Sequence, residues 1–161
     1  MEQNRTYPDF EEWRENAIPT ASGLKLAPED FYVQDGIGQR KKHFNWDEAM
    51  KYEKAVLRPN GWRLPTRDEW IKIANEFKTP DKLRYILRLG LNGTICWYDM
   101  NKYRQNPNKV RTIFQDVCGY YWSSTKANEA ETYFMFLNES ITNPAGDSGV
   151  CSGFSMRCLA V

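Results

Sequence analysis

Four cysteines and one histidine are the side chains of this 161-residue chain best suited to metal binding or thiol chemistry. The cysteines are Cys96, Cys118, Cys151 and Cys158, without a C-x-x-C pair, and His43 stands among lysines. Structural zinc sites need four such ligands at short, characteristic spacings, which this chain does not offer. We therefore expect no metal and no cofactor. We interpret the cysteines as free thiols in a reducing compartment, with a Cys151 to Cys158 disulfide as the alternative.

The stretch TYFMFLNES, residues 132–140, could instead take part in binding, because a strand of this sequence would carry apolar side chains on both of its faces. A strand with one buried face alternates apolar and polar residues. One of the two possible registers of this strand points Tyr133, Met135 and Leu137 toward the core. Phe134 and Phe136 would then point away from the core, and something must cover them.

Two coverings for these phenylalanine rings remain open. The first is a ligand outside the chain, since exposed apolar patches on soluble proteins normally have a partner. The second is the N-terminal segment, whose Phe10 and Trp13 would make both faces of the strand part of the core.

The charge balance and hydropathy narrow the functional class. The chain has 22 Lys and Arg residues and 21 Asp and Glu residues, which gives a net charge of +1. A chain with so small a net charge has no long-range field that would attract nucleic acid or an anionic membrane. The N-terminus has no basic start followed by an apolar run, and no apolar stretch is long enough to span a bilayer. We expect a protein made in the cytoplasm, without signal peptide or membrane insertion, which a virion could carry.

Two capping boxes predict helix starts in the first half of the chain. Asn45 and Thr66 are N-cap residues, and each is followed three places on by a glutamate that can reach back to the cap. Apolar residues then recur at helical spacing, which gives each helix one buried stripe. A third helix is predicted over residues 80–89, with Gly90 as a left-handed stop.

From Leu91 onward the chain consists of short β-rich runs separated by Asn, Pro, Gly and Asp. These runs are LNGTICWY, VRTIFQ, GYYWSST, ETYFMFLN and GFSMRCLAV. Residues 1–22 have turn formers but no clear period and are predicted to form an irregular arm. The order of elements predicts a single α+β domain over residues 1–161, with two or three helices packed on short antiparallel strands.

Three ordered motifs carry a family resemblance. They are Gly61-Trp62-Arg63-Leu64-Pro65-Thr66-Arg67-Asp68-Glu69-Trp70, Gly119-Tyr120-Tyr121-Trp122-Ser123-Ser124-Thr125 and Gly153-Phe154-Ser155-Met156-Arg157-Cys158. Together they resemble bacterial and phage domains with the C-type lectin fold, in the branch of formylglycine-generating enzymes and the variable proteins of diversity-generating retroelements. The resemblance implies that Trp62 and Trp70 are buried, that the last strand pairs near the first, and that Arg157 faces a carboxylate or water.

Three activities occur on this fold, and each needs different residues. Calcium-dependent sugar binding needs several oxygen ligands on one loop, but Asn143-Pro144-Ala145 and Asn45-Trp46-Asp47 match neither lectin motif and suit a turn and a helix cap. Formylglycine-generating enzymes need a reactive cysteine pair before the closing motif, whereas only Cys151 precedes Gly153 here. Ligand binding without catalysis is therefore the function that the resemblance favours. The oxidase, or a structural domain of a virion or surface assembly, is the alternative.

In the variable proteins a reverse transcriptase misreads template adenines, so that asparagine codons become diverse residues on a displayed face. The resemblance implies a ligand-display region over residues 119–161, centred on the late strands and the 138–152 loop. It also implies that Tyr133, Met135 and Leu137 face inward. The candidate ligand-binding residues are Phe134, Phe136, Asn138, Ser140, Thr142, Asn143, Asp147, Ser148, Val150 and Asn128. The expected partner is a macromolecule, either a protein or a cell-surface receptor, and not nucleic acid.

One compositional feature agrees with this interpretation. An asparagine codon altered only at its two adenines cannot encode Lys, Glu, Gln, Met or Trp. The segment SITNPAGDSGVCSGF, residues 140–154, contains none of these five residue types. Upstream of this segment four residues depart from the rule and would be constant positions: Lys126, Glu129, Glu131 and Glu139.

Overall fold

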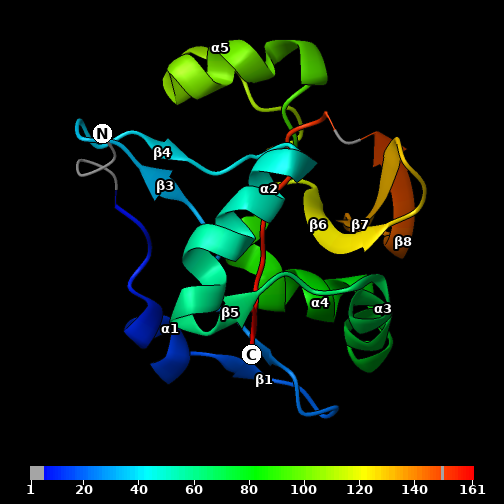
Figure 1. Cartoon of the computed structure of the whole chain (residues 1–161). Coiled ribbons are helices and arrows are strands. Elements are labelled where there is room, and N and C mark those ends of the chain that lie inside the picture. The colour runs from blue at the N-terminus through cyan, green and yellow to red at the C-terminus, as the bar shows by residue number, and fades with distance from the viewer. Residues whose placement is uncertain (1–5, 150) are drawn as a thin grey trace.

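The computed structural model describes residues 6–149 and 151–161 and has a mixed α+β architecture (Figure 1). Its α-helices in this part of the chain are α1 (Phe10–Glu15), α2 (Trp46–Tyr52), α3 (Arg67–Glu76), α4 (Pro80–Leu87) and α5 (Met100–Gln105). A π-helical turn, Glu53–Leu57, and a 3-10 turn, Arg58–Asn60, extend α2. None of the helices described has the length and hydropathy needed to cross a membrane.

The strands of the described residues form three antiparallel sheets. The first has the order β1 (Ile18–Pro19), β2 (Lys25–Leu26), β9 (Leu159–Ala160) and β5 (Trp62–Arg63). The second is the hairpin of β3 (Val33–Gln34) and β4 (Arg40–Lys41), and the third joins β6 (Gly119–Lys126), β7 (Glu131–Leu137) and β8 (Thr142–Gly149). The α+β prediction is confirmed. The closing strand does return, because β9 pairs with both β2 and β5.

Both predicted capping boxes form. Asn45 accepts the backbone N–H of Glu48, whose carboxylate accepts the N–H of Asn45, and Thr66 and Glu69 make the same exchange at the start of α3. Each box pairs donors that a helix start otherwise leaves unsatisfied. Gly61, just before β5, has a φ of 85°, the left-handed conformation that glycine adopts without strain. The sequence therefore predicts the starts of α2 and α3 correctly.

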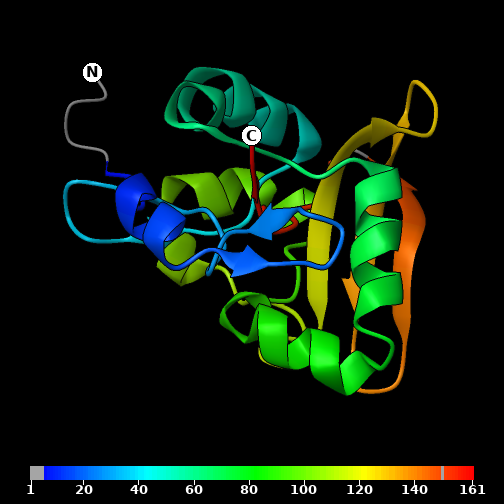
Figure 2. The same ribbon diagram turned by 90° about the horizontal axis from the view of Figure 1, so that it is seen from below.

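Trp62 and Trp70 are both fully buried, as the resemblance implies, but they belong to different core clusters. The ring of Trp62 lies 5.2 Å from that of Trp13, in the cluster that includes the closing segment of the chain. The ring of Trp70 lies 5.6 Å from that of Tyr121 in a second cluster. Figures 1 and 2 show α3, which carries Trp70, lying against the sheet β6-β7-β8.

Several segments differ from the predictions. The N-terminal arm is not irregular, because Asp9 caps α1 and β1 joins the first sheet. Residues 100–105 form the unexpected helix α5, and residues 110–115 make only a bridge at Ile113. Residues 142–149, expected in a loop, form β8. Elements this short have little stability of their own, so their tertiary contacts decide them and the local pattern is weak.

The predicted left-handed turn does not explain the glycine at position 90, just after α4. Gly90 is not among the glycines of positive φ, and a Cβ at this position would lie 2.2 Å from Asp30 Oδ1. Asp30 Oδ1 accepts a hydrogen bond from Arg157 Nε at 3.0 Å, and Asp30 Oδ2 accepts one from Asn92 Nδ2 at 3.0 Å. Burial raises the pKa of the Asp30 carboxyl, and the charge of Arg157 opposes that rise. Arg157 thus faces a carboxylate, as expected.

The hydroxyl of Tyr103 holds α5 against the chain that follows β4. It accepts the backbone N–H groups of Lys42 at 2.8 Å and His43 at 3.2 Å, and it lies 3.1 Å from His43 Nδ1. His43 Nε2 lies 2.7 Å from the carbonyl oxygen of Asn92, so the imidazole proton is assigned to Nε2. Burial lowers the pKa of His43 to about 4, which keeps the ring neutral near pH 7.

Substituting Gly90 with alanine should destabilise the fold, because the new Cβ collides with the Asp30 carboxylate. We expect Gly90→Ala to lower the free energy of unfolding by at least about 2 kcal/mol, measured by urea denaturation. Gly149→Ala is the matched control, since a Cβ there meets nothing within 4 Å. Equal stability of the two variants would contradict the packing of Gly90 on Asp30.

His43 should make stability fall on mild acidification. Its ordinary pKa is 6.5, so between pH 6.5 and about pH 4 the unfolded chain binds a proton that the folded chain excludes. From about pH 7.5 to about pH 5 we expect a loss of roughly 2 kcal/mol in unfolding free energy. In urea denaturation at the two pH values, the variant His43→Gln should not show this loss of unfolding free energy. The same pH dependence in both proteins would rule out a buried neutral imidazole.

Candidate ligand-binding face

The sheet β6-β7-β8 has two faces, because successive side chains of a strand point to opposite sides. Residues paired directly across antiparallel strands share a face. Tyr121 pairs with Met135, and both are buried in one cluster with Trp70 of α3. Leu137 is buried there too, while Tyr133 is half-buried. The predicted inward register of β7 is therefore correct.

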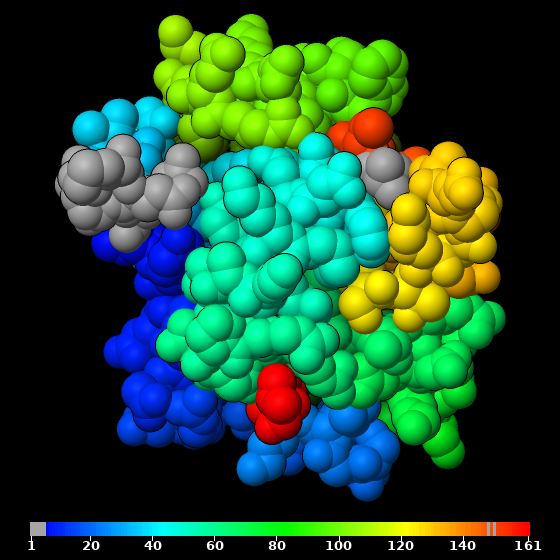
Figure 3. Space-filling model, in the orientation of Figure 1, coloured from blue at the N-terminus to red at the C-terminus, as the bar shows by residue number. Residues whose placement is uncertain are grey.

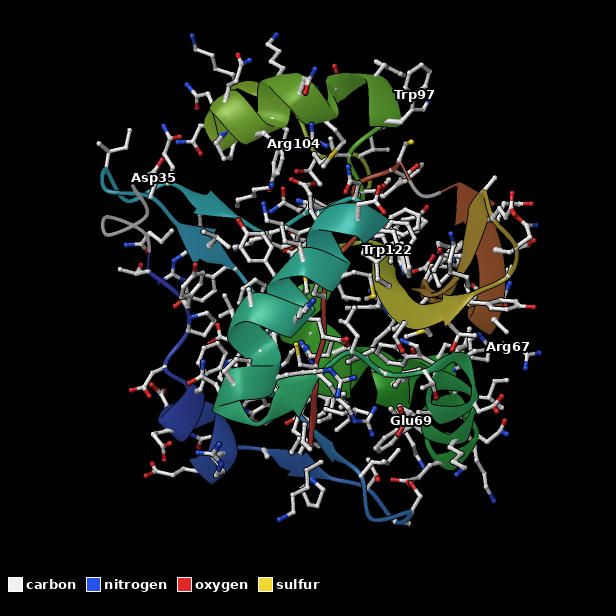
Figure 4. The ribbon with its side chains drawn as sticks, viewed as in Figure 1. Asp35, Arg67, Glu69, Trp97, Arg104 and Trp122 are labelled. Atoms are coloured by element: carbon white, nitrogen blue, oxygen red, sulfur yellow. The ribbon has the colours of Figure 1, made fainter. Side chains whose placement is uncertain are left out.

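The opposite face carries aromatic rings from β6, β7 and the closing segment. This aromatic face consists of Tyr120, Trp122, Phe134, Phe136 and Phe154. Phe134 lies 4.9 Å from Phe154 and 6.1 Å from Tyr120, and Phe136 lies 5.0 Å from Tyr120, between ring centroids. The strand pairing shifts register on both sides of β7, which bends the sheet. Figure 4 shows side chains filling the hollow of this bend beside Trp122.

Burial divides the rings of the aromatic face. Trp122 and Phe154 are buried, and Trp122 Nε1 donates to the carbonyl oxygen of Phe44 at 2.6 Å. Tyr120, Phe134 and Phe136 remain partly exposed. Phe134 is thus covered in part by the chain itself, through Phe154. The two phenylalanines of β7 are half-buried, neither fully displayed nor enclosed in the core.

The N-terminal segment belongs to the same core cluster as the buried part of the aromatic face, because Trp13, Trp122 and Phe154 are members and Phe10 and Phe134 pack against it. Phe10 meets Trp13 edge to face at 5.1 Å, and Trp13 packs on Trp62 of the first sheet. Figures 1 and 2 place α1 on the opposite side of the molecule from β7. Together with the partial exposure of Phe134 and Phe136, this contradicts a strand buried on both faces by the N-terminal segment.

Strand β8 places the candidate residues on both faces of the sheet. Asn143 pairs with Phe136 and is exposed at the aromatic face. Thr142 and Asp147 pair with inward-facing residues of β7 and so lie on the side of α3. Asp147 is nevertheless exposed at the end of that pairing. Of these three candidates, the structure brings only Asn143 next to the phenylalanines.

Asn128 and Asn138 stabilise the turns at the two ends of β7. The Oδ1 atom of Asn128 accepts two backbone N–H groups, each at 2.9 Å, and that of Asn138 accepts two at 2.8 and 2.7 Å. Side-chain acceptors of this kind are typical of Asn in turns. Ser140 is exposed in the second turn. Val150 and the side chain of Ser148 lie outside the described residues.

Trp97 and Tyr98 form an exposed aromatic pair that the sequence analysis did not identify. Their side chains are 66% and 67% exposed. The antiparallel bridge between Ile95 and Gly153 brings this pair beside the chain at Cys151, and Figure 4 labels Trp97 at that corner. The run LNGTICWY predicts a strand here, but Trp97 begins a 3-10 turn, Trp97–Asp99, and no local sequence pattern indicates that both rings are exposed.

The cysteines are free, which contradicts the Cys151 to Cys158 disulfide. Cys151 is exposed, whereas Cys158 is buried, and burial raises the pKa of its thiol well above the usual value. Asn45 is the expected helix cap, and Asn143 Oδ1 accepts the N–H of Ala145 in a local turn. In residues 6–149 and 151–161, no three His, Cys, Asp or Glu side chains gather where they could hold a metal ion.

Comparisons with known proteins identify no relative of this chain. No family model, no curated protein and no solved structure matches this chain. Its function must therefore be argued from its own residues and geometry.

The two faces of β7 should respond differently to polar substitution. Met135→Asn places an unpaired amide in the core and should cost about 2–5 kcal/mol of unfolding free energy. Phe136→Asn removes a half-exposed ring with one aromatic neighbour, Tyr120, and should cost about 1 kcal/mol. Urea denaturation measures both. A greater cost for Phe136→Asn would mean that the face assignment is reversed.

Proposed function

We propose that this protein binds a macromolecular ligand, a protein or a cell-surface receptor, through the aromatic face and the turns beside it, without catalysis. The observation that carries the proposal is the partial exposure of Tyr120, Phe134 and Phe136 on one face of a sheet whose other face is packed on α3. Aromatic rings supply large contact areas at low entropic cost, so they serve as anchors of binding surfaces.

The surroundings of these rings suit such an interface. Asn143 at the aromatic face and Ser140 in the adjoining turn are exposed polar residues, the composition of an interface rim. Trp97 and Tyr98 add a second exposed aromatic group beside the closing segment. Figure 3 shows the hairpin of β6 and β7 at one edge of the molecular surface, where a large partner has access.

In this proposal the domain has the C-type lectin fold and is a variable protein of a diversity-generating retroelement, of bacterial or phage origin. The buried residues on the α3 side would remain constant, while exposed positions on β8 and in the turns would vary. The separation of the sheet into a packed face and a partly open face supports this division. The three sequence motifs support the fold assignment.

The oxidase alternative has less support. It needs a pair of reactive thiols, and the nearest pair in sequence, Cys151 and Cys158, has one member buried with a raised thiol pKa. A thiolate is the reactive form of cysteine, so Cys158 is poorly suited to that chemistry.

The DNA that flanks the gene tests the retroelement origin. We expect a near copy of the region encoding the residues after Ser123, with asparagine codons at displayed positions, beside a reverse transcriptase gene. Gene copies from one growing population should differ at Asn143 and Ser140 and agree at Trp62 and Trp70. Flanking DNA without such a copy, or variation spread evenly over all four positions, would refute this origin.

A peptide oxidation assay tests the absence of catalysis. The purified protein, loaded with copper, is incubated in oxygen with a cysteine-containing peptide, and mass spectrometry follows the conversion of cysteine to formylglycine. We expect no conversion above that of the variant Cys151→Ser. Conversion that depends on Cys151 would establish the oxidase instead.

A further inference from the structure

A cavity of about 820 Å³ lies away from the aromatic face, and none of its lining residues belongs to β6, β7 or β8. Its walls come from the chain at β4, from α5 and the 3-10 turn after it, and from residues 110–115. Cavities of roughly 300–1,000 Å³ are the usual size of small-molecule sites. The cavity is therefore large enough for a ligand of metabolite size.

The charged residues of this cavity are all cationic. Arg40 and Lys42 come from the chain at β4 and Arg111 from the segment 110–115, and no Asp or Glu belongs to the lining. Arg40 donates from Nε to Gln34 and stacks on Tyr32. Within the described chain, neither Lys42 nor Arg111 forms an ion pair with a carboxylate. Cations gathered without counter-charges raise the local potential and attract anions.

The wall that carries Lys42 is rigid. The Tyr103 hydroxyl accepts the backbone N–H groups of Lys42 and His43, and the His43 ring is fixed in turn by Asn92. These buried hydrogen bonds hold the backbone at Lys42 before any ligand arrives. A preorganised site loses less entropy on binding, which favours affinity.

The segment 110–115 contributes an aromatic residue, Phe114, whose backbone has an unusual conformation. Phe114 has a φ of 62°, which bulky residues rarely adopt, and its side chain is 54% exposed. Its carbonyl oxygen accepts the N–H groups of Val117 and Cys118, and Asp116 donates from its backbone to Leu91. These bonds hold the turn in place. Backbone strain of this kind concentrates at functional sites.

We propose that this cavity binds a small phosphorylated molecule whose phosphate lies between Lys42 and Arg111 and whose flat ring packs on Phe114. A phosphate dianion carries enough charge and enough oxygen acceptors for cations from two walls, whereas one carboxylate would leave the cationic excess uncompensated. The remaining volume and the Phe114 ring accommodate a base or another planar group. This site is separate from the aromatic face and does not depend on the function proposed above.

Titration with inorganic phosphate, adenosine monophosphate and benzoate tests the charge preference. His43 is the single histidine of the chain and lines the cavity, so its imidazole NMR signal reports binding there without ambiguity. At low ionic strength and pH 7.5 we expect saturable shifts with phosphate and, at lower concentration, with adenosine monophosphate, but not with benzoate. Added sodium chloride should weaken both.

Charge-matched variants test the residues. Lys42→Gln/Arg111→Gln should weaken the binding of adenosine monophosphate by more than about tenfold, whereas Lys54→Gln/Lys72→Gln, at exposed positions outside the cavity, should leave it unchanged. Phe114→Gly removes the ring at a φ that glycine accepts, and should reduce the affinity for adenosine monophosphate while leaving that for phosphate intact.

Three results would overturn the proposal. The first is an absence of any saturable shift of the His43 signal with phosphate or adenosine monophosphate. The second is equal weakening in the two double variants, which would indicate a general charge effect. The third is displacement of adenosine monophosphate by a short single-stranded oligonucleotide of much higher affinity, which would assign the cavity to nucleic acid.

Discussion

Asp30 and Arg157 form an ion pair in the interior, and much of the fold is arranged around it. The two residues are 127 positions apart, and their side chains are 3% and 0% exposed, so the pair joins the chain before β3 to the closing segment. Arg157 bonds Asp30 through Nε, and its two terminal nitrogens make no hydrogen bond within the described chain. Removing one member of a buried pair typically costs about 3–5 kcal/mol, because the other charge stays buried. Asn92 donates a second hydrogen bond to Asp30. Gly90 has no side chain, which leaves room for the Asp30 carboxylate.

The network continues from this pair to both binding surfaces that we propose. Tyr121, on β6, donates its hydroxyl to the carbonyl oxygen of Gly90 at 2.6 Å, which ties the long sheet to the same loop. In the other direction, the carbonyl oxygen of Asn92 meets His43 in the cavity wall. The aromatic face and the cationic cavity are therefore built on one rigid centre, although their side chains do not overlap.

The candidate binding face was predictable in part. The family resemblance places Met135 inward and Phe134 and Phe136 outward, and the structure agrees, whereas the run itself is apolar on both sides and does not decide the register. The sequence could not show that Phe154 would cover Phe134, because that contact depends on how the closing segment runs beside β6. The exposure of Trp97 likewise follows from its place beside the closing segment, which no pattern within a few residues encodes.

By itself, the sequence determined features that arise within a few residues, above all the two capping boxes at Asn45 and Thr66. These depend on hydrogen bonds and side-chain directions that the neighbouring residues already define. The tertiary structure alone decided the short helix α5, the reason for Gly90, and the gathering of Lys42 and Arg111 around one cavity. Each of these depends on contacts between segments distant in the chain, whose energy appears only when the whole domain is packed.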